Sequence, residues 1–115
     1  MIINNTGLDE LGKVGHPELD SVTFERGNPC FVDNSDRHRA GEMCQVLNDH
    51  WGYGKCDLNY KSLPDMIETL CACRKVGADY LLNVGPEGDG KIPDMQKTMI
   101  EAMGTWIKEC GNSIY

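Results

Sequence analysis

Short apolar runs recur along the chain, and each is followed by a polar loop that contains glycine or asparagine. The run around Val22 is β-branched and aromatic, as strands are. The run around Leu81 is apolar at successive positions, which is typical of a parallel strand buried on both faces. The pattern predicts four strands, over Met1–Asn5, Ser21–Phe24, Met43–Leu47 and Tyr80–Val84.

Two longer stretches carry apolar residues at three- and four-residue steps, the spacing of an amphipathic helix. The first stretch begins after Ser62, a natural N-cap, and stops at Gly77. The second opens at Pro93-Asp94 and is closed by Gly111. Three methionines of the second helix are expected to pack in the core, namely Met95, Met99 and Met103.

The order of these elements is strand, strand, strand, helix, strand, helix, which predicts an α/β fold with a parallel sheet. The 115 residues suit one domain, 1–115, with a modest core. Polar and aromatic residues gather just after the strands, at Asn4-Asn5, Glu25, Asp49-His50-Trp51 and Asn83. In α/β folds the carboxyl ends of the strands form the functional rim, so these residues are the candidates for a site.

Composition narrows the classes of partner. The net charge of −7 argues against a surface that binds nucleic acid or an anionic membrane. No apolar run approaches the ~20 residues of a membrane helix, and the N-terminus lacks the pattern of a signal peptide. Nothing in these residues directs the chain out of the cytoplasm, which favours a cytoplasmic location and leaves the compartment of the parent protein open. The polar run Asp36–Arg39 is expected to be a solvated loop.

Six cysteines are present. Three of them lie within apolar helix or strand patterns, where a thiol behaves as a small hydrophobe, so we expect free thiols rather than disulfides or a metal site. Cys71 and Cys73 would point in different directions on a helix and would be poor joint ligands. The chain shows no phosphate loop, zinc spacing or Ser-His-Asp pattern, and no cofactor or metal is expected.

The stretch Asn48–Tyr53 is the most informative for function. An indole and a phenol on a turn after a strand suit a sugar, because a flat apolar face with a polar edge matches a pyranose ring. The alternative is that Trp51 is simply a core residue, as large aromatics usually are. His50 has two interpretations as well, a ligand for a sugar hydroxyl or an ordinary loop histidine.

Several blocks of the sequence together resemble a known family. They are Asn48–Tyr53, Asn59–Ser62, Leu81–Pro86 followed by Asp89-Gly90 and Ile92-Pro93, Gly104–Trp106, and Ile114-Tyr115. In this order they are similar to the C-terminal half of the catalytic domain of family 29 α-L-fucosidases. The resemblance implies a partial (β/α)₈ TIM-like barrel, roughly strands five to eight with their helices.

The resemblance also implies a chemistry. These enzymes are retaining glycosidases, which need two carboxyl groups ~5 Å apart, a nucleophile and an acid/base. The family's nucleophile follows the fourth strand, before the segment matched here. Glu25 falls at the acid/base position, and Glu42 is the reserve. The alternative for Glu25 is a surface glutamate paired with Arg26.

The remaining contacts to substrate are also carried by the resemblance. Trp51 falls where the family places an aromatic against the fucose methyl group. His50, Asp49 and either Asn4 or Asn5 are secondary candidates for binding substrate. Many members have Asn-Asp-Arg where this chain has Asn4-Asn5-Thr6, so one arginine contact is missing.

The expected function is hydrolysis of terminal α-L-fucosides by the parent enzyme, with a fucosylated glycan or a small fucoside as partner. Two alternatives belong to other classes. The chain is then either an inactive half-barrel that pairs with itself or with a separate N-terminal half, or a carbohydrate-binding module that uses Trp51 and Tyr53.

Overall fold

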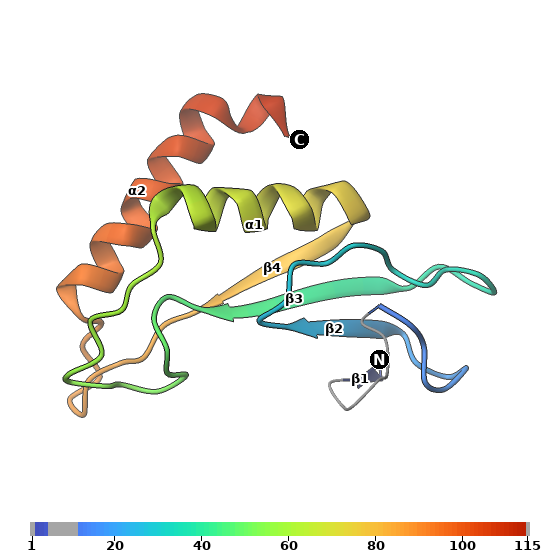
Figure 1. Ribbon diagram of the computed structural model, residues 1–115, viewed down its shortest axis with the longest axis horizontal. Helices are drawn as coiled ribbons and strands as arrows, with labels where there is room; N and C mark the ends of the chain where they lie inside the picture. Colours follow the sequence, from blue (N-terminus) through green and yellow to red (C-terminus); the bar gives the residue numbers. More distant parts are fainter. Residues whose placement is uncertain (1, 5–11, 115) are drawn as a thin grey trace. The chain divides into compact units, whose positions relative to one another are not determined.

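The computed structural model describes residues 2–4 and 12–114. Its elements follow the predicted order of three strands, a helix, a strand and a helix, with a final 3₁₀ turn (Figure 1). They are β1 Ile3–Asn4, β2 Ser21–Glu25, β3 Ala40–Val46, α1 Leu63–Val76, β4 Ala78–Asn83, α2 Asp94–Cys110 and η1 Gly111–Ser113. Within these residues, no helix is long and apolar enough to cross a membrane.

The strands form one sheet in the order β1-β2-β3-β4, so strands that are consecutive in sequence are neighbours in space. β1 pairs with β2, and β2 with β3, in parallel. The β2–β3 register runs from Ser21 opposite Ala40 to Glu25 opposite Cys44. The predicted α/β class with a parallel sheet is therefore confirmed.

The prediction placed the start of β3 three residues too late. β3 begins at Ala40, whose backbone N–H donates to the carbonyl of Asp20. The strand thus begins where pairing with β2 begins, although Glu42 is charged. Burial alternates along its first half, with Gly41 and Met43 buried and Glu42 half-buried. Glu42 consequently lies inside a strand and not in the loop before it.

β4 also differs from the prediction. It spans Ala78–Asn83 instead of Tyr80–Val84, and it is not buried on both faces, because Leu81 is 47% exposed. β4 is at one edge of the sheet. Its side chains alternate between a face that buries Ala78 and a face that carries Leu81.

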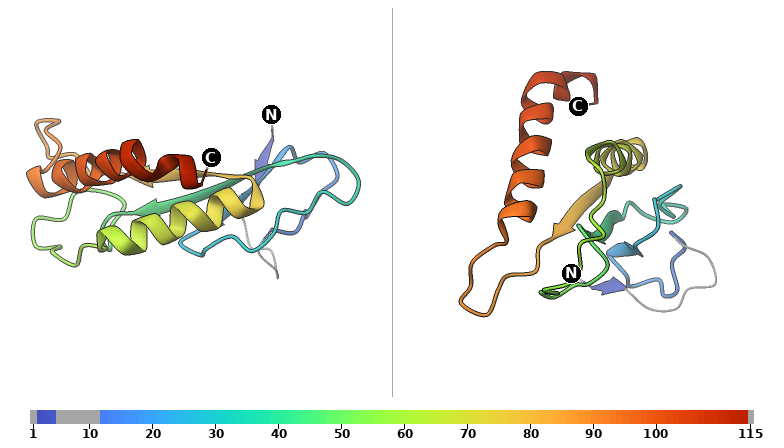
Figure 2. Two further views of the ribbon diagram at one scale, coloured as in Figure 1. Left: turned by 90° about the horizontal axis from the view of Figure 1, so that it is seen from above. Right: turned by 60° about the vertical axis from the view of Figure 1, so that its left-hand side comes forward.

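The chain divides into two compact units, one made of residues 1–45 and 69–81 and the other of residues 46–68 and 82–115. The core of the first unit lies on one face of the sheet, and Figure 2 shows the C-terminal turns of α1 on one side of β2 and β3. Its buried members are Val22, Phe24, Met43, Cys73 and Ala78, with Val14, Val32, Val76 and Tyr80 packed against them.

Loops complete this core where a helix would be expected. Between β2 and β3 the chain, residues 26–39, contains no helix. Val32 of this crossover packs over Gly41 so closely that a Cβ there would lie 2.8 Å from a Val32 methyl. Val14 contributes from the segment before β2. Val14 and Val32, both on loops, thus pack against this core at positions where α/β folds commonly have a helix.

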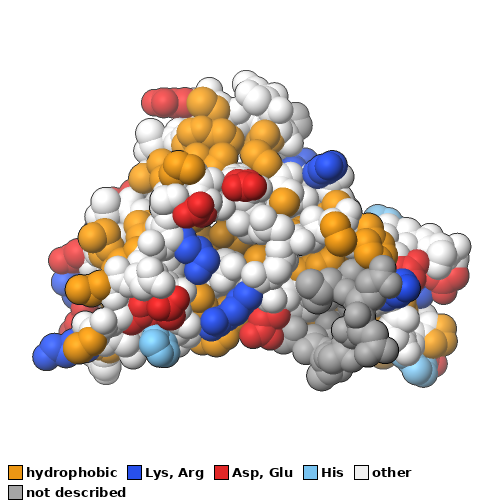
Figure 3. All heavy atoms as spheres, in the orientation of Figure 1, with side chains coloured by type: hydrophobic (Ala, Val, Ile, Leu, Met, Phe, Trp, Pro, Cys, Tyr) orange, Lys and Arg blue, Asp and Glu red, His pale blue; other side chains and the backbone are white. Residues whose placement is uncertain are grey.

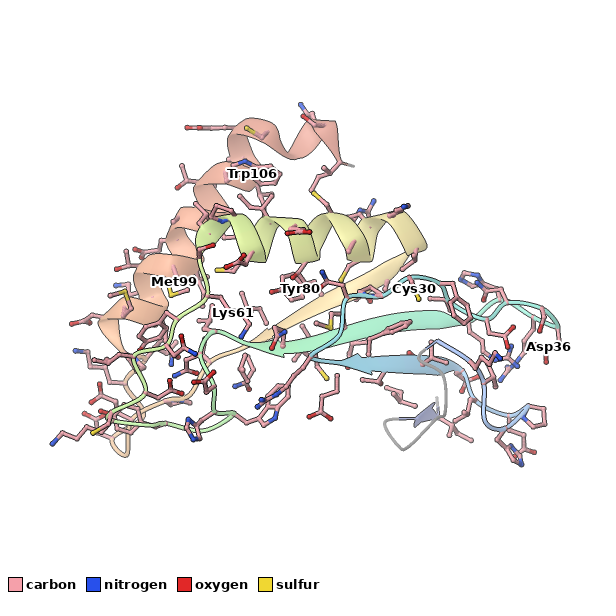
Figure 4. The ribbon with its side chains drawn as sticks, in the orientation of Figure 1. Cys30, Asp36, Lys61, Tyr80, Met99 and Trp106 are labelled. Atoms are coloured by element: carbon pink, nitrogen blue, oxygen red, sulfur yellow. The ribbon has the colours of Figure 1, made fainter. Side chains whose placement is uncertain are left out.

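The run Asp36–Arg39 is not simply a solvated loop, and that prediction was wrong for Arg39. Its side chain is buried, with 1% exposed. The guanidinium donates to the carboxylate of Asp36, with Nη2 to Oδ2 at 2.9 Å, and to the carbonyls of Pro17, Leu19 and Asp33. The hydrogen bonds from Arg39 lower the pKa of Asp36 to about 2. Figure 4 places Asp36 in this loop, beyond the amino end of β3.

The ends of α1 follow the predicted signals. The Ser62 hydroxyl accepts from the backbone N–H of Asp65 at 3.3 Å, while the Asp65 carboxylate accepts from the backbone N–H of Ser62 at 3.0 Å. This reciprocal pair is a capping box. Gly77 ends the helix with φ at +72°, a backbone conformation that favours glycine.

α2 is less buried than its pattern predicts. Met103 is 8% exposed, but Met95 is 55% exposed, so the methionine series is only partly core. Gly111 follows the helix with φ at −57° and continues into η1. All six cysteines are free, as predicted. Burial raises the pKa of Cys73 to about 11, which keeps it a neutral thiol.

Candidate functional site

The sheet face opposite the core of the first unit is polar. Thr23 lies opposite Glu42 and Glu25 opposite Cys44 in the β2–β3 register, and paired positions of a parallel ladder share a face. Glu25 is exposed and is the last residue of β2. Burial raises the pKa of the Cys44 thiol, and the negative charges of Glu25 and Glu42 raise it further. Two carboxylates therefore flank one thiol at the carboxyl-end half of β2.

A backbone turn follows Glu25 directly. Arg26 adopts φ of 58°, uncommon outside glycine, and its N–H donates to the carbonyl of Cys44 at 3.0 Å. This bond fixes the chain as it leaves the sheet. The position of Glu25 at the strand end is thus set by backbone pairing with β3.

The second unit carries the other candidates on the loop after β3. Oδ2 of Asp57 accepts from the backbone N–H of Asp49 at 2.9 Å, from that of His50 at 3.1 Å, and bonds Nδ1 of His50 at 2.7 Å. The Asp57 side chain is 4% exposed, whereas that of His50 is 69% exposed. The hydrogen bond from His50 is the main cause that lowers the pKa of Asp57. One buried carboxylate therefore orients the whole Asp49-His50 turn.

Asp49 is held by a residue later in the same loop. Nδ2 of Asn59 donates to both of its carboxylate oxygens, at 3.1 and 3.0 Å. Around these groups lies an open pocket of ≈ 640 Å³. It is lined by Asp49, His50, Gly54, Cys56, Asp57, Leu58 and Asn59.

Trp51 is 36% exposed and Tyr53 46%, so the interpretation of Trp51 as an ordinary core residue is wrong. The Asn83 amide donates to the carbonyl of Trp51 at 2.7 Å. The bond ties the end of β4 to the loop after β3. Gly85 lies against this turn, since a Cβ there would lie 2.7 Å from the carbonyl of Gly52.

The structure thus separates the predicted residues into two groups. Glu25 and Glu42 belong to the first unit, and Asp49, His50 and Trp51 to the second. Asn4 is in β1, and Asn5 lies outside the described residues. In the described ranges, no group of three or more His, Cys, Asp or Glu side chains is placed to hold a metal ion.

Sequence reasoning missed Asp57 and Asn59. A local signal existed, because an aspartate two residues before a backbone N–H favours an Asx turn. The N–H of Asn59 does donate to Oδ1 of Asp57, at 3.3 Å. No sequence motif predicted the second contact of Asp57, its hydrogen bond to His50 seven residues earlier.

Comparison with known proteins agrees with the motifs. The α-L-fucosidase family model matches residues 1–112. Plasma α-L-fucosidase of Rattus norvegicus is 31% identical over 91 residues, which are 70% of this chain and 20% of that protein. α-L-Fucosidase isoenzyme 1 from Paenibacillus thiaminolyticus superposes with a TM-score of 0.76 and 33% identity, over 84% of this chain and 23% of that one. The Thermotoga maritima α-fucosidase in complex with fucose superposes with a TM-score of 0.68 and 30% identity, over 88% of this chain and 22% of that one.

The chain therefore belongs to the α-L-fucosidase family of glycoside hydrolases. It spans about a fifth of the length of the curated and solved relatives named above.

Proposed function

We propose that this chain forms strands five to eight of a (β/α)₈ barrel and supplies part of the active site of a retaining α-L-fucosidase. Two observations support the barrel assignment. The strands are neighbours in chain order, and β1, β2 and β3 pair in parallel, as consecutive barrel strands do. One face of the sheet packs the core, and the opposite face carries Glu25 and Glu42.

Glu25 serves in this proposal as the acid/base that protonates the leaving oxygen. The observation that carries the assignment is its place as the last residue of β2, because functional groups of such barrels sit at the carboxyl ends of strands. A second carboxylate, Glu42, shares its face.

The loop after β3 binds the sugar in this proposal. Trp51 offers an exposed aromatic face, and Asp49 and His50 offer polar atoms beside a pocket. Asn5 remains a proposed contact by the family motif alone. The fucose complex of the Thermotoga maritima relative identifies the ligand class of that protein, and we carry it to this chain as terminal α-L-fucosides.

The 115 residues alone are expected not to hydrolyse fucosides at an enzymatic rate. A double displacement needs a nucleophile as well as an acid/base, and the family motif for the nucleophile has no match in this sequence. Rapid turnover of an aryl α-L-fucoside by the pure chain, abolished by Glu25→Gln, would contradict this expectation.

A chimera tests the role of Glu25. This chain replaces the matching segment of the Paenibacillus thiaminolyticus enzyme, and kcat/KM is measured for methyl and 2,4-dinitrophenyl α-L-fucosides. Glu25→Gln is expected to lower kcat/KM about 1,000-fold for the methyl fucoside, whose leaving group needs a proton. The loss should be much smaller for the dinitrophenyl fucoside, which leaves without one.

Glu42→Gln in the same chimera is the matched control. It shares the sheet face and the amide substitution with Glu25→Gln. If the leaving-group-dependent loss follows Glu42→Gln and spares Glu25→Gln, the acid/base is Glu42. Equal losses on both substrates for Glu25→Gln would indicate a binding or folding role instead.

A second candidate function is that of an inactive half-barrel that pairs with a second copy or with an N-terminal half. Exposed apolar residues at both sheet edges favour it, with Ile3 of β1 50% exposed and Leu81 of β4 47% exposed. Figure 3 shows further apolar side chains gathered over α2, which carries the exposed Met95 and Ile100. Open edges and apolar faces promote association. Analytical ultracentrifugation of the pure chain tests pairing with a second copy, which predicts a dimer or larger species and is excluded by a monomer.

A further inference from the structure

His50 and Asp57 form a pair with opposite exposures. The carboxylate is almost fully buried, and the imidazole that it holds stands 69% exposed at the pocket. Two backbone N–H groups and the ring share the same oxygen, Oδ2. A purely structural histidine would gain by packing its ring, whereas this ring is anchored at one nitrogen and left open.

The chemistry of the anchor fixes the ring's hydrogen. The lowered pKa of Asp57 keeps it ionised, and an ionised carboxylate can only accept hydrogen bonds. Nδ1 of His50 must therefore donate across the 2.7 Å contact. In the neutral ring the other nitrogen, Nε2, then has a free lone pair and can only accept.

The packing of the loop indicates which edge of the ring is open. A Cβ on Gly54 would lie 3.0 Å from Cβ of Asp57 and 3.6 Å from Nδ1 of His50. Gly54 and Asp57 thus cover the Nδ1 edge. Because Asp57 engages Nδ1 and the side chain is 69% exposed, the edge left for a ligand is the opposite one, which carries Nε2.

We propose that Asp57 is a positioning residue that holds His50 with its hydrogen on Nδ1, so that Nε2 accepts the hydrogen of a sugar hydroxyl bound in the pocket. This inference rests on the proposed fucoside-binding function for its ligand. Its first half, control of the tautomer by Asp57, stands independently of which sugar is bound.

The groups beside His50 narrow the class of sugar that the pocket can bind. Asp49 lines the same pocket, and its carboxylate can only accept hydrogen bonds, as it does from the Asn59 amide. The Lys61 ammonium donates to the carbonyl of Asn48. Two acceptors on adjacent residues of one pocket, together with the charges of Asp49 and Asp57, favour a neutral diol over a uronate or a sulfated sugar, whose anionic groups would meet carboxylates.

The test reads the tautomer and the affinity separately on the full chain. Long-range ¹H–¹⁵N correlation spectra at about pH 8 distinguish Nδ1–H from Nε2–H, and His50→Gln assigns the signals among the three histidines. L-Fucose and D-galacturonate are titrated into the same samples. The unsubstituted chain should show the Nδ1–H form and bind fucose in preference to galacturonate.

Asp57→Asn should move hydrogen to Nε2, because an amide can donate to Nδ1, and weaken fucose binding about 10-fold. Asp65→Asn is the matched control, an acid hydrogen-bonded within the α1 cap, and should change neither reading. An Nε2–H ring in the unsubstituted chain, or unchanged spectra in Asp57→Asn, would overturn the proposal. An Nδ1–H ring without any fucose binding would instead contradict the proposed function and remove the sugar-accepting role with it.

Discussion

Two polar networks tie loops to the fold, one around Arg39 in the first unit and one around Asp57 in the second. Arg39 is 2% exposed, and its guanidinium donates hydrogen bonds to Asp36 and to three backbone carbonyls. Asp57 is equally hidden, with 4% of its side chain exposed, but its partner His50 is 69% exposed. Both networks lie beside pockets, of ≈ 250 and ≈ 640 Å³ respectively.

The two networks differ in the hydrogen-bonding groups that they leave available to a ligand. In the Arg39 network every nitrogen of the guanidinium already has an acceptor, so the group stabilises the loop and has nothing left for a ligand. In the Asp57 network the buried charge orients a second group whose other edge faces the pocket. We call the Arg39 network closed, because it only stabilises the fold, and the Asp57 network open, because it can also bind a ligand. Substitutions should separate these two roles.

The largest effect is expected from Arg39→Met, which removes a buried charge and leaves backbone carbonyls without donors. The melting temperature should fall by about 10 °C, with fucose affinity per folded molecule unchanged. Arg37→Met is the matched control, because its side chain is 42% exposed where it pairs with Asp20. A loss for Arg37→Met as large as that for Arg39→Met in thermal unfolding would contradict the distinction.

Gly85→Ala should have the next largest effect. The added Cβ would lie 2.7 Å from backbone atoms of Gly52 and 2.9 Å from the backbone nitrogen of Tyr53, and none of these is a side chain that can turn away. We expect a loss of about 2 kcal/mol in urea unfolding, together with a shift of the Trp51 emission. Gly88→Ala, which meets nothing within 4 Å, should stay within about 0.5 kcal/mol.

Acid should weaken the closed network in a defined window. The folded-state pKa of Asp36 is about 2, below the ordinary value of ~3.9. Its contribution to stability is therefore complete above about pH 4 and is lost as pH falls toward about 2. Asp36→Asn should lower the melting temperature by about 3 °C at pH 7 and flatten its decline between those limits. An equally steep decline in the variant would assign the acid sensitivity to other carboxylates.

The smallest effect is expected from Gly54→Ala, which acts on the open network alone. Its Cβ would press on Asp57 at 3.0 Å and tilt the carboxylate under His50. Fucose affinity should fall about threefold, with little change in melting temperature. Gly52→Ala lies in the same loop but meets nothing within 4 Å, so equal losses in the two variants would place the effect in the loop backbone instead.

Local rules predicted much of this molecule. The cap at Ser62 and the stop at Gly77 depend on near neighbours in sequence, and the structure has them where the pattern indicated. β2 begins at Ser21 as predicted and ends one residue later than predicted, at Glu25. The β4 strand was misjudged because its burial depends on its place at the sheet edge. Periodicity alone cannot supply that position.

Long-range polar contacts were the harder part. Arg39 reaches carbonyls 20 and 22 residues earlier in the chain, so its polar neighbours in sequence suggested a solvated loop. Asp57 acts on His50 seven residues before it. The motif around Trp51 indicated the candidate site, but the role of the Asp57 carboxylate in shaping it became visible only in the structure.

The most direct test of the account is fucose binding at Trp51. The Trp106→Phe variant leaves Trp51 as the single tryptophan, and Figure 4 places Trp106 on α2. L-Fucose should shift its fluorescence with a dissociation constant on the order of millimolar, while Trp51→Phe, which leaves Trp106, should not respond. An unchanged spectrum of Trp106→Phe up to about 100 mM fucose, or the same response in both variants, would contradict the claim that this loop binds the sugar.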